Sequence, residues 1–395
     1  YGSHDRPKQP TYVITGIQEG SIMTRTGISA VWHDSGERWE LRELPVPEVE
    51  PDGISVRVRA TGLCGSDLHI WRNDGAAPSA PPRDPFVFGH EMMGEIAGLG
   101  SKVRTDSLQR TLKEGDRVVF PYFFPCMRCY NCIRGEMAAC AYRLGRKPLS
   151  EWNVCNGGFA QYYYLRSTHF IFKAPDDLSN AALAPLNCAM SQVMEALHLG
   201  TVRMDDTIVV QGAGGLGIYA TAIAAEQGAR KVIVIDGQKP RLELAVRCGA
   251  TDTIDMSEYP TAEARIDRVM QLTNGIGADR VIELVGFPNV MEEGVKMCRI
   301  RGTYLEIGNI MPNSIPQIDM HEMIWKQIRL FAVQHYDPWI IPAAMNFISR
   351  TRDRYPLADL VSHEFSLDNI AEAFETSEWV GRADGTAVTR AVITP

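Results

Sequence analysis

The stretch DDTIVVQGAGGLGIYATAIAAEQGARKVIVID, residues 205–236, decides the fold. A short apolar run leads into a glycine turn, a long alanine-rich run and a second apolar run that ends in Asp236. This change in the spacing of the apolar residues predicts a strand, a helix and a second strand. Similar runs follow in ADRVIELVG and GTYLEIGN. Because strands that alternate with helices are typical of parallel sheets, we predict an α/β fold with a doubly wound sheet.

A glycine motif lies in the turn of this unit. Gly212, Gly214 and Gly217 spell G-x-G-x-x-G directly between the first strand and the helix. Glycine lets the chain turn tightly and lets a pyrophosphate approach the backbone, while the helix N-terminus offers unpaired N–H groups. Asp236 can accept hydrogen bonds from an adenosine ribose, and it would repel a 2′-phosphate. The motif therefore favours NAD(H) over NADP(H).

Two basic residues close to Asp236, Lys239 and Arg241, act against this preference. The alternative is a tight strand-to-helix turn without a ligand, which the combination of strand, glycines, helix and acid disfavours. The predicted cofactor-binding residues are Gly212, Gly214, Gly215, Leu216, Gly217, Asp236 and Arg241.

A different pattern occupies residues 28–175, where short strand-like runs such as ISVRVRATGL and FAQYYYLRS are broken by Gly and Pro. It predicts a β-rich, barrel-like domain. The tail after about residue 340 predicts a helix and a strand that return to this first domain. We therefore expect a β-rich domain over 23–190, a nucleotide-binding domain over 191–338 and a returning segment over 339–395.

Composition limits the partners and the location. The chain has 395 residues, 45% of them hydrophobic and 22% charged, which is typical of a globular protein with two domains. A net charge of -8 argues against a nucleic-acid partner. No run approaches the roughly 18 apolar residues of a membrane span, and residues 1–22 lack the apolar core of a secretory signal. We expect a cytoplasmic protein with no membrane partner, and we leave residues 1–22 out of the site.

Four of the nine cysteines lie in CMRCYNCIRGEMAAC, residues 126–140. The candidate roles are a disulfide knot, a redox pair, a nucleic-acid knuckle and a metal site. The acidic charge weakens the knuckle, and an odd number of cysteines without an export signal favours metal ligation over disulfides. Four cysteines close the coordination sphere of zinc, so we predict a structural zinc site. Its ligands are Cys126, Cys129, Cys132 and Cys140.

A second group of zinc ligands is scattered along the chain. GLCGSDLH, residues 62–69, supplies Cys64, and GHEMMGEIAGLGSKV, residues 89–103, supplies His90 beside Glu91. APLNCAMSQVMEAL offers Cys188 as a third ligand. Three protein ligands and one open position are the arrangement of a catalytic zinc, whereas a lone cysteine is more often a buried apolar thiol.

Together these motifs resemble the zinc-containing medium-chain alcohol dehydrogenase family over about residues 28–395. GHEMMGEIAGLGSKV fits the zinc signature of that family, G-H-E-x2-G-x5-G-x2-V. The APLNC string and the segment TDSLQRTLKEGDRV are similar to a subgroup near phosphonate catabolism. The resemblance implies a GroES-like catalytic domain, a Rossmann domain, two zinc ions per chain, NAD(H) and a homodimer or homotetramer. Sorbitol-type members have Glu where this chain has Ala184, which makes Cys188 the better third ligand.

The resemblance also implies catalytic roles. Cys64, His90 and Cys188 would hold the catalytic zinc, with Glu91 as an alternating ligand. Zinc favours loss of the alcohol proton, and hydride then passes to nicotinamide. The predicted catalytic residues are Cys64, Ser66, His69, His90, Glu91 and Cys188, with Ser66 and His69 as a proton relay. The alternative for His69 is a surface or helix-capping histidine.

Three further side chains have predicted roles around the site. Asp67 is expected to orient His90, since ligating imidazoles usually donate their other N–H to a carboxylate; a turn-stabilising Asp is the alternative. Trp71 and Phe86 are candidate walls of the substrate pocket, and packing in the protein interior is the alternative for both rings.

We predict reversible oxidation of a primary or secondary alcohol to an aldehyde or ketone. The alternatives are a zinc-free quinone or enoyl reductase and a non-catalytic nucleotide-binding protein on the same fold. Neither of them needs the scattered zinc ligands.

Overall fold

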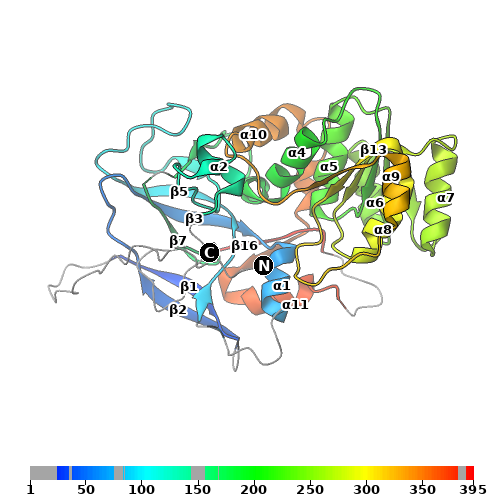
Figure 1. Ribbon diagram of the computed structural model, residues 1–395. Coiled ribbons are helices and arrows are strands. Elements are labelled where there is room, and N and C mark those ends of the chain that lie inside the picture. Colours follow the sequence, from blue (N-terminus) through cyan, green and yellow to red (C-terminus); the bar gives the residue numbers. More distant parts are fainter. Residues whose placement is uncertain are drawn as a thin grey trace, which may run out of the picture.

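The computed structural model describes residues 25–34, 38–74, 83, 85–143, 156–167, 169–380 and 388–395. A β-rich body and an α/β body lie side by side (Figure 1). Within the described part of the chain, no helix combines the length and apolar character that crossing a membrane requires.

The α/β body is built on a six-stranded sheet in the order β11-β10-β9-β12-β13-β14. All five of its strand pairings are parallel, as expected for strands joined by helical crossovers. The central strand β9 is buried along its whole length, which explains its continuous apolar run. The strands are β9 (Thr207–Gln211), β10 (Lys231–Asp236), β11 (Asp252–Asp255), β12 (Ala278–Glu283), β13 (Cys298–Glu306) and β14 (Arg329–Ala332).

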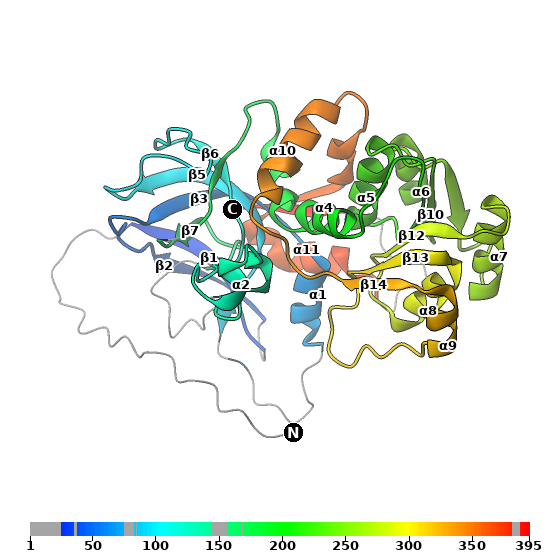
Figure 2. The same cartoon turned by 45° about the horizontal axis from the view of Figure 1, so that its top comes forward.

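Helices cover both faces of this sheet (Figure 2). The helix α5 (Gly215–Glu226) begins directly after β9 and packs against α4 (Ala189–Leu199), which enters from the β-rich body. The other helices of this half are α6 (Lys239–Arg247), α7 (Ala262–Leu272), α8 (Pro288–Met297), α9 (Met320–Lys326) and α10 (Ile340–Thr351).

The β-rich body contains two sheets. A larger one runs β15-β16-β3-β5-β6-β8, with β7 also paired to β3, and a smaller one runs β2-β1-β4. Their strands are β1 (Thr26–Trp32), β2 (Trp39–Pro45), β3 (Ile54–Gly62), β4 (Phe86–Val87), β5 (Glu91–Leu99), β6 (Arg117–Val119), β7 (Tyr162–Leu165), β8 (Phe172–Lys173), β15 (His363–Ser366) and β16 (Ala391–Thr394). The helices of this body include α1 (Gly65–Arg72), α2 (Tyr130–Ile133) and α3 (Asn180–Leu183).

The end of the chain lies within the β-rich body. The strand β16 pairs antiparallel with β3, and the helix α11 (Ile370–Ser377) packs beside it. One apolar core is shared by the two bodies, because it includes Met93 of β5, Val193 of α4 and Ile208 of β9. The predicted fold class is confirmed, and the predicted domain boundaries stay a prediction.

Candidate active site

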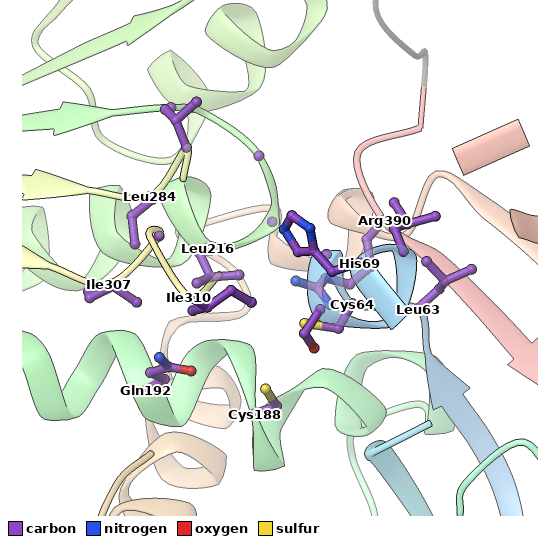
Figure 3. A pocket seen from close by; sticks show the side chains of 18 of the residues that line it. Leu63, Cys64, His69, Cys188, Gln192, Leu216, Leu284, Ile307, Ile310 and Arg390 are labelled. Atoms are coloured by element: carbon purple, nitrogen blue, oxygen red, sulfur yellow. The ribbon is translucent and has the colours of Figure 1, made fainter. Parts of the chain in front are cut away.

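A cavity of about 470 Å³ lies between the two bodies. Figure 3 shows Cys188, directly before the helix α4, and Gln192, within α4, on one side of the cavity, with Cys64 and His69 across from them. Apolar side chains line the side nearest the parallel sheet, among them Leu216, Leu284 and Ile307. Most of the residues predicted from the separate motifs therefore meet at one cavity.

Four candidate metal ligands meet at one end of this cavity. Cys64 immediately precedes α1, His90 and Glu91 stand at the start of β5, and Cys188 immediately precedes α4. One ligand atom from each of the four residues lies within 4.8 Å of the others. Two thiols, an imidazole and a carboxylate at this spacing fit a zinc ion.

The protonation of this cluster also suits a cation. A hydrogen bond with Cys188 holds the pKa of Cys64 well below its usual value, and His90 contributes in the same direction. The same hydrogen bond, together with burial, raises the pKa of Cys188. One proton is thus shared by two thiols, and a metal ion would displace it because thiolates are the ligating form.

His90 is oriented by the residue that the sequence suggested. Its Nδ1 lies 3.2 Å from the Asp67 carboxylate, while its Nε2 lies 3.5 Å from the Ser66 hydroxyl. Although burial opposes the charged imidazolium, Asp67 and Cys64 raise the pKa of His90 to about 10. The Asp67 contact leaves Nε2 as the nitrogen available to a metal.

A buried ion pair backs the metal cluster. Arg390, one residue before β16, donates to the Glu91 carboxylate, and both side chains are almost fully buried. Burial nevertheless raises the pKa of Glu91 to about 8. The second oxygen of Glu91, Oε1, is buried without a hydrogen-bond partner among the described residues, so it remains available to a cation.

Sequence reasoning missed Arg390. The two members of the pair are 299 positions apart, and the surrounding TAVTRAVITP carries no signal for a charged site. The Arg390 guanidinium also lies against Gly215, at the start of α5 and in the space that a side chain there would fill. It therefore adds a positive charge where the helix N-terminus already favours an anion.

The glycine turn has the shape that a nucleotide requires. Gly212 has a φ of +96°, which favours glycine, and a Cβ on Gly217 would collide with the Gly212 carbonyl. Asp236 accepts hydrogen bonds from the backbone N–H groups of Ala213 (2.6 Å) and Gln238 (2.8 Å). Its carboxylate thus helps to shape the turn as well as lining the cavity.

The remaining cofactor candidates differ in position. Gly212, Gly214, Gly215, Leu216, Asp236 and Arg241 line the cavity, whereas Gly217 packs behind the turn. Arg241 donates to the Val388 carbonyl (2.8 Å), which links α6 to the segment that carries Arg390.

A buried carboxyl group, that of Glu283, and a half-buried one, that of Glu306, hold the loops on the nucleotide side. Glu283 and Glu306 are paired across β12 and β13. Glu283 accepts from the backbone N–H groups of Val285 (2.6 Å), Gly286 (2.7 Å) and Gly308 (3.0 Å). Burial, and then the neighbouring Glu306, raise the pKa of Glu283 to about 8. The pair therefore keeps a proton near neutral pH.

The four-cysteine loop forms a separate cluster outside the cavity lining. One sulfur atom from each of Cys126, Cys129, Cys132 and Cys140 lies within 4.8 Å of the others. The backbone N–H of Cys132 lowers the pKa of Cys129 to about 6, whereas burial raises the pKa of Cys132 to about 12. Four thiols at this spacing fit a zinc ion with no position left for a substrate.

The predicted proton relay and the predicted aromatic walls of the pocket differ from the observed arrangement. His69 lines the cavity, but its Nδ1 contacts Asp74 (2.7 Å), and among the described residues it makes no direct hydrogen bond with Ser66. The prediction for Trp71 and Phe86 is wrong for this cavity. Trp71 packs on Phe374 and Phe86 packs on Trp32, because an aromatic cluster of the β-rich body captures both rings.

The comparisons with known proteins agree with this geometry. Residues 50–176 match the family "Alcohol dehydrogenase GroES-like domain", and residues 215–350 match "Zinc-binding dehydrogenase". The chain is 34% identical over 344 residues to 5-exo-hydroxycamphor dehydrogenase of Pseudomonas putida, covering 86% of this chain and 92% of that protein. It is 29% identical to L-threonine 3-dehydrogenase of Alteromonas mediterranea over 85% of this chain and 92% of that one. An alcohol dehydrogenase structure from Thermotoga maritima superposes with a TM-score of 0.84 at 26% identity, over 94% of this chain and 100% of that chain.

Proposed function

The chain belongs to the zinc-containing medium-chain alcohol dehydrogenase family, and on that premise we propose that it oxidises a primary or secondary alcohol reversibly to an aldehyde or ketone with NAD(H). The observation that carries this proposal is the meeting of Cys64, His90 and Cys188 at a cavity that the glycine turn also lines. A redox cofactor and a Lewis acid would thereby act on the same substrate.

Each residue of the metal cluster has a role in this proposal. A bound zinc ion supplies the Lewis acidity that makes an alcohol proton easy to lose. Cys64, His90 and Cys188 would hold it, and the contact of His90 Nδ1 with Asp67 leaves Nε2 as the nitrogen that would bind the metal. Glu91, with one unpartnered oxygen, would serve as the alternating ligand.

The glycine turn and Arg390 would bind the cofactor. The N-terminus of α5 and the guanidinium provide positive potential for a pyrophosphate, and Asp236 favours the ribose of NAD(H) over a 2′-phosphate. Ser66 lies within reach of the His90 ring, and His69 lines the cavity. We assign the departing proton to these two side chains, with a water molecule or the cofactor ribose joining them.

We further propose a second zinc ion per chain in the four-cysteine loop, where it stabilises the fold without taking part in the chemistry. Four thiols within 4.8 Å of one another support this assignment. A cytoplasmic location, where thiols stay reduced, fits the eight described cysteines, all of which are free.

A homodimer or homotetramer is the proposed assembly. The strand β14 is at the edge of the parallel sheet, and within the described chain it has a neighbour on one side only. All four of its residues are exposed, including Leu330 and Phe331. An exposed apolar edge strand is a ready template for pairing with a second copy.

Metal analysis and a substrate screen test the proposal. About two zinc ions per chain, together with zinc-dependent NADH formation from an alcohol, are expected. A zinc-free reductase would instead act on a conjugated double bond, and a nucleotide-binding protein would bind NADH without turnover. Either result would defeat the proposal. Phosphonate-bearing alcohols in the screen test the predicted kinship with the phosphonate subgroup.

A further inference from the structure

One polar pair in the cavity belongs to neither the metal cluster nor the glycine turn. The Tyr122 hydroxyl lies 2.7 Å from His335 Nδ1, and both residues line the cavity. Tyr122 follows β6 in the β-rich body, whereas His335 follows β14 in the parallel sheet. Their hydrogen bond therefore joins the two bodies at the cavity wall.

Tyr122 borders the metal cluster. Its ring meets the His90 imidazole edge to face, with 4.8 Å between the ring centroids. Cys188 lines the same cavity as Tyr122. An alcohol that reacts between Cys64, His90 and Cys188 would thus have the tyrosine hydroxyl beside its carbinol group.

Both members of the pair are neutral near pH 7. A phenol ordinarily loses its proton at about pH 10, and an imidazole is mostly neutral above its ordinary pKa of about 6.5. A neutral imidazole and a phenol each offer a donor and an acceptor. The pair can therefore bind a hydroxyl or a carbonyl, but it offers no full charge to a carboxylate or an ammonium group.

His335 is held firmly in place. The next residue, Tyr336, donates its hydroxyl to the Asn187 carbonyl, and Asp337 accepts from the backbone N–H of Ala138 (2.9 Å). His335 itself has a φ of +66°. Three successive residues are thus fixed to the β-rich body, and groups held in this way are preorganised for recognition.

We propose that Tyr122 and His335 determine specificity by binding a second, uncharged oxygen on the carbon next to the reacting carbinol. The preferred substrates are then vicinal diols and, in reverse, the corresponding hydroxy ketones. Simple alcohols leave the remaining donor and acceptor of the pair unused, and hydroxy acids or amino alcohols bring a charge that the pair does not match. The inference rests on the proposed function.

Matched substrates test the inference. In steady-state kinetics the wild type should have a kcat/KM roughly 100-fold higher for 2,3-butanediol than for 2-butanol, which has the same carbon skeleton. Tyr122→Phe removes only the hydroxyl. It should reduce this preference by about 10-fold or more, because kcat/KM for the diol decreases while kcat/KM for 2-butanol stays the same. Zinc content and NADH affinity should not change. Tyr355→Phe, whose hydroxyl contacts Glu226 (3.2 Å) outside the cavity, is the control.

Three outcomes would overturn the inference and leave the proposed function standing. They are equal use of 2-butanol and the diol by the wild type, a preference for lactate or 1-amino-2-propanol, and an equal loss for both test substrates in Tyr122→Phe. If no alcohol at all reduced NAD, the proposed function itself would fail, and the inference with it.

Discussion

The two groups of metal ligands in this chain are assembled in opposite ways. The four cysteines of residues 126–140 lie in one short loop, and their spacing brings them together. Cys64, His90 and Cys188 come from three separate segments, each placed by a different element. A local loop can therefore build a closed metal site, whereas the second site depends on the packing of β5, α1 and α4.

The two groups of metal ligands also differ in how deeply they are buried and in whether they line the cavity. Cys126 and Cys129 are half-buried and lie outside the lining of the cavity between the two bodies, whereas His90 and Cys188 are buried in that lining. An open coordination position is useful only where a substrate and a cofactor can reach it. The comparison thus teaches that spacing decides whether a metal can bind, and that tertiary assembly decides whether the metal can do chemistry.

The largest expected effect, on turnover and zinc content, comes from the cluster of Cys64, His90 and Cys188. Cys188→Ala should lose one zinc ion and lower turnover by roughly 1000-fold or more, because a three-ligand site retains only two of its protein ligands. NADH binding and the second zinc ion should persist. Metal analysis and NADH fluorescence titration are the measurements. Cys248→Ala, a buried thiol outside both clusters, is the control.

Two zinc ions and normal activity in Cys188→Ala would exclude Cys188 as a ligand. The search would then move to Glu91, which is already in the cluster, or to Cys155, which lies outside the described residues.

A smaller effect, on stability alone, is expected from the four-cysteine cluster of residues 126–140. Cys129→Ser should lower the Tm by on the order of 5–10 °C, because the metal contributes folding energy to its loop. The zinc ion held by Cys64, His90 and Cys188 should remain bound. Thermal unfolding and metal analysis check this, with the exposed Tyr130→Phe as the control. Full stability with two bound zinc ions would contradict the structural role.

A change of cofactor preference is the next expected effect. Asp236→Ser should narrow the ratio of kcat/KM for NAD over NADP by roughly 10-fold, because repulsion of the 2′-phosphate is relieved. Asp255 ends the neighbouring strand β11 opposite Asp236, and it lies outside the cavity. Asp255→Ser should therefore leave the ratio unchanged. A wild type that prefers NADP would contradict the assignment of Asp236.

The smallest effect concerns residues brought together by strand register. The folded state holds the Glu283 proton up to a pKa of about 8, whereas an ordinary glutamic acid loses it near 4.5. The stability from this proton is full at acid pH and is lost as the pH rises through 8. In Glu306→Gln the neighbouring charge is absent, so the decrease in Tm between pH 6 and 9 should be smaller by a few degrees. Thermal unfolding across this pH range is the measurement. The same dependence of Tm on pH in the wild type and in Glu306→Gln would show that the two carboxyl groups are not coupled.

The residues that the sequence suggested and those that it missed differ in how they are connected. Asp67 lies near His90 as expected, because a ligating imidazole needs an acceptor and GLCGSDLH offered one. Arg390 has no such local signal, since its partner Glu91 belongs to a distant strand. The aromatic rings of Trp71 and Phe86 were assigned to the wrong surface for the same reason. Their partners, Phe374 and Trp32, lie far away in the sequence.

The sequence by itself determined the fold class, the glycine turn and the four-cysteine cluster, because periodicity and spacing act over a few residues. It also indicated the types of ligand in the second cluster, because softness and charge belong to single side chains. Only the tertiary structure decided that these ligands share one cavity with the glycine turn. It alone decided that Arg390 backs Glu91 and that Tyr122 meets His335. The physical reason is that such contacts depend on how two bodies pack, and packing is a sum over many residues that no short stretch contains.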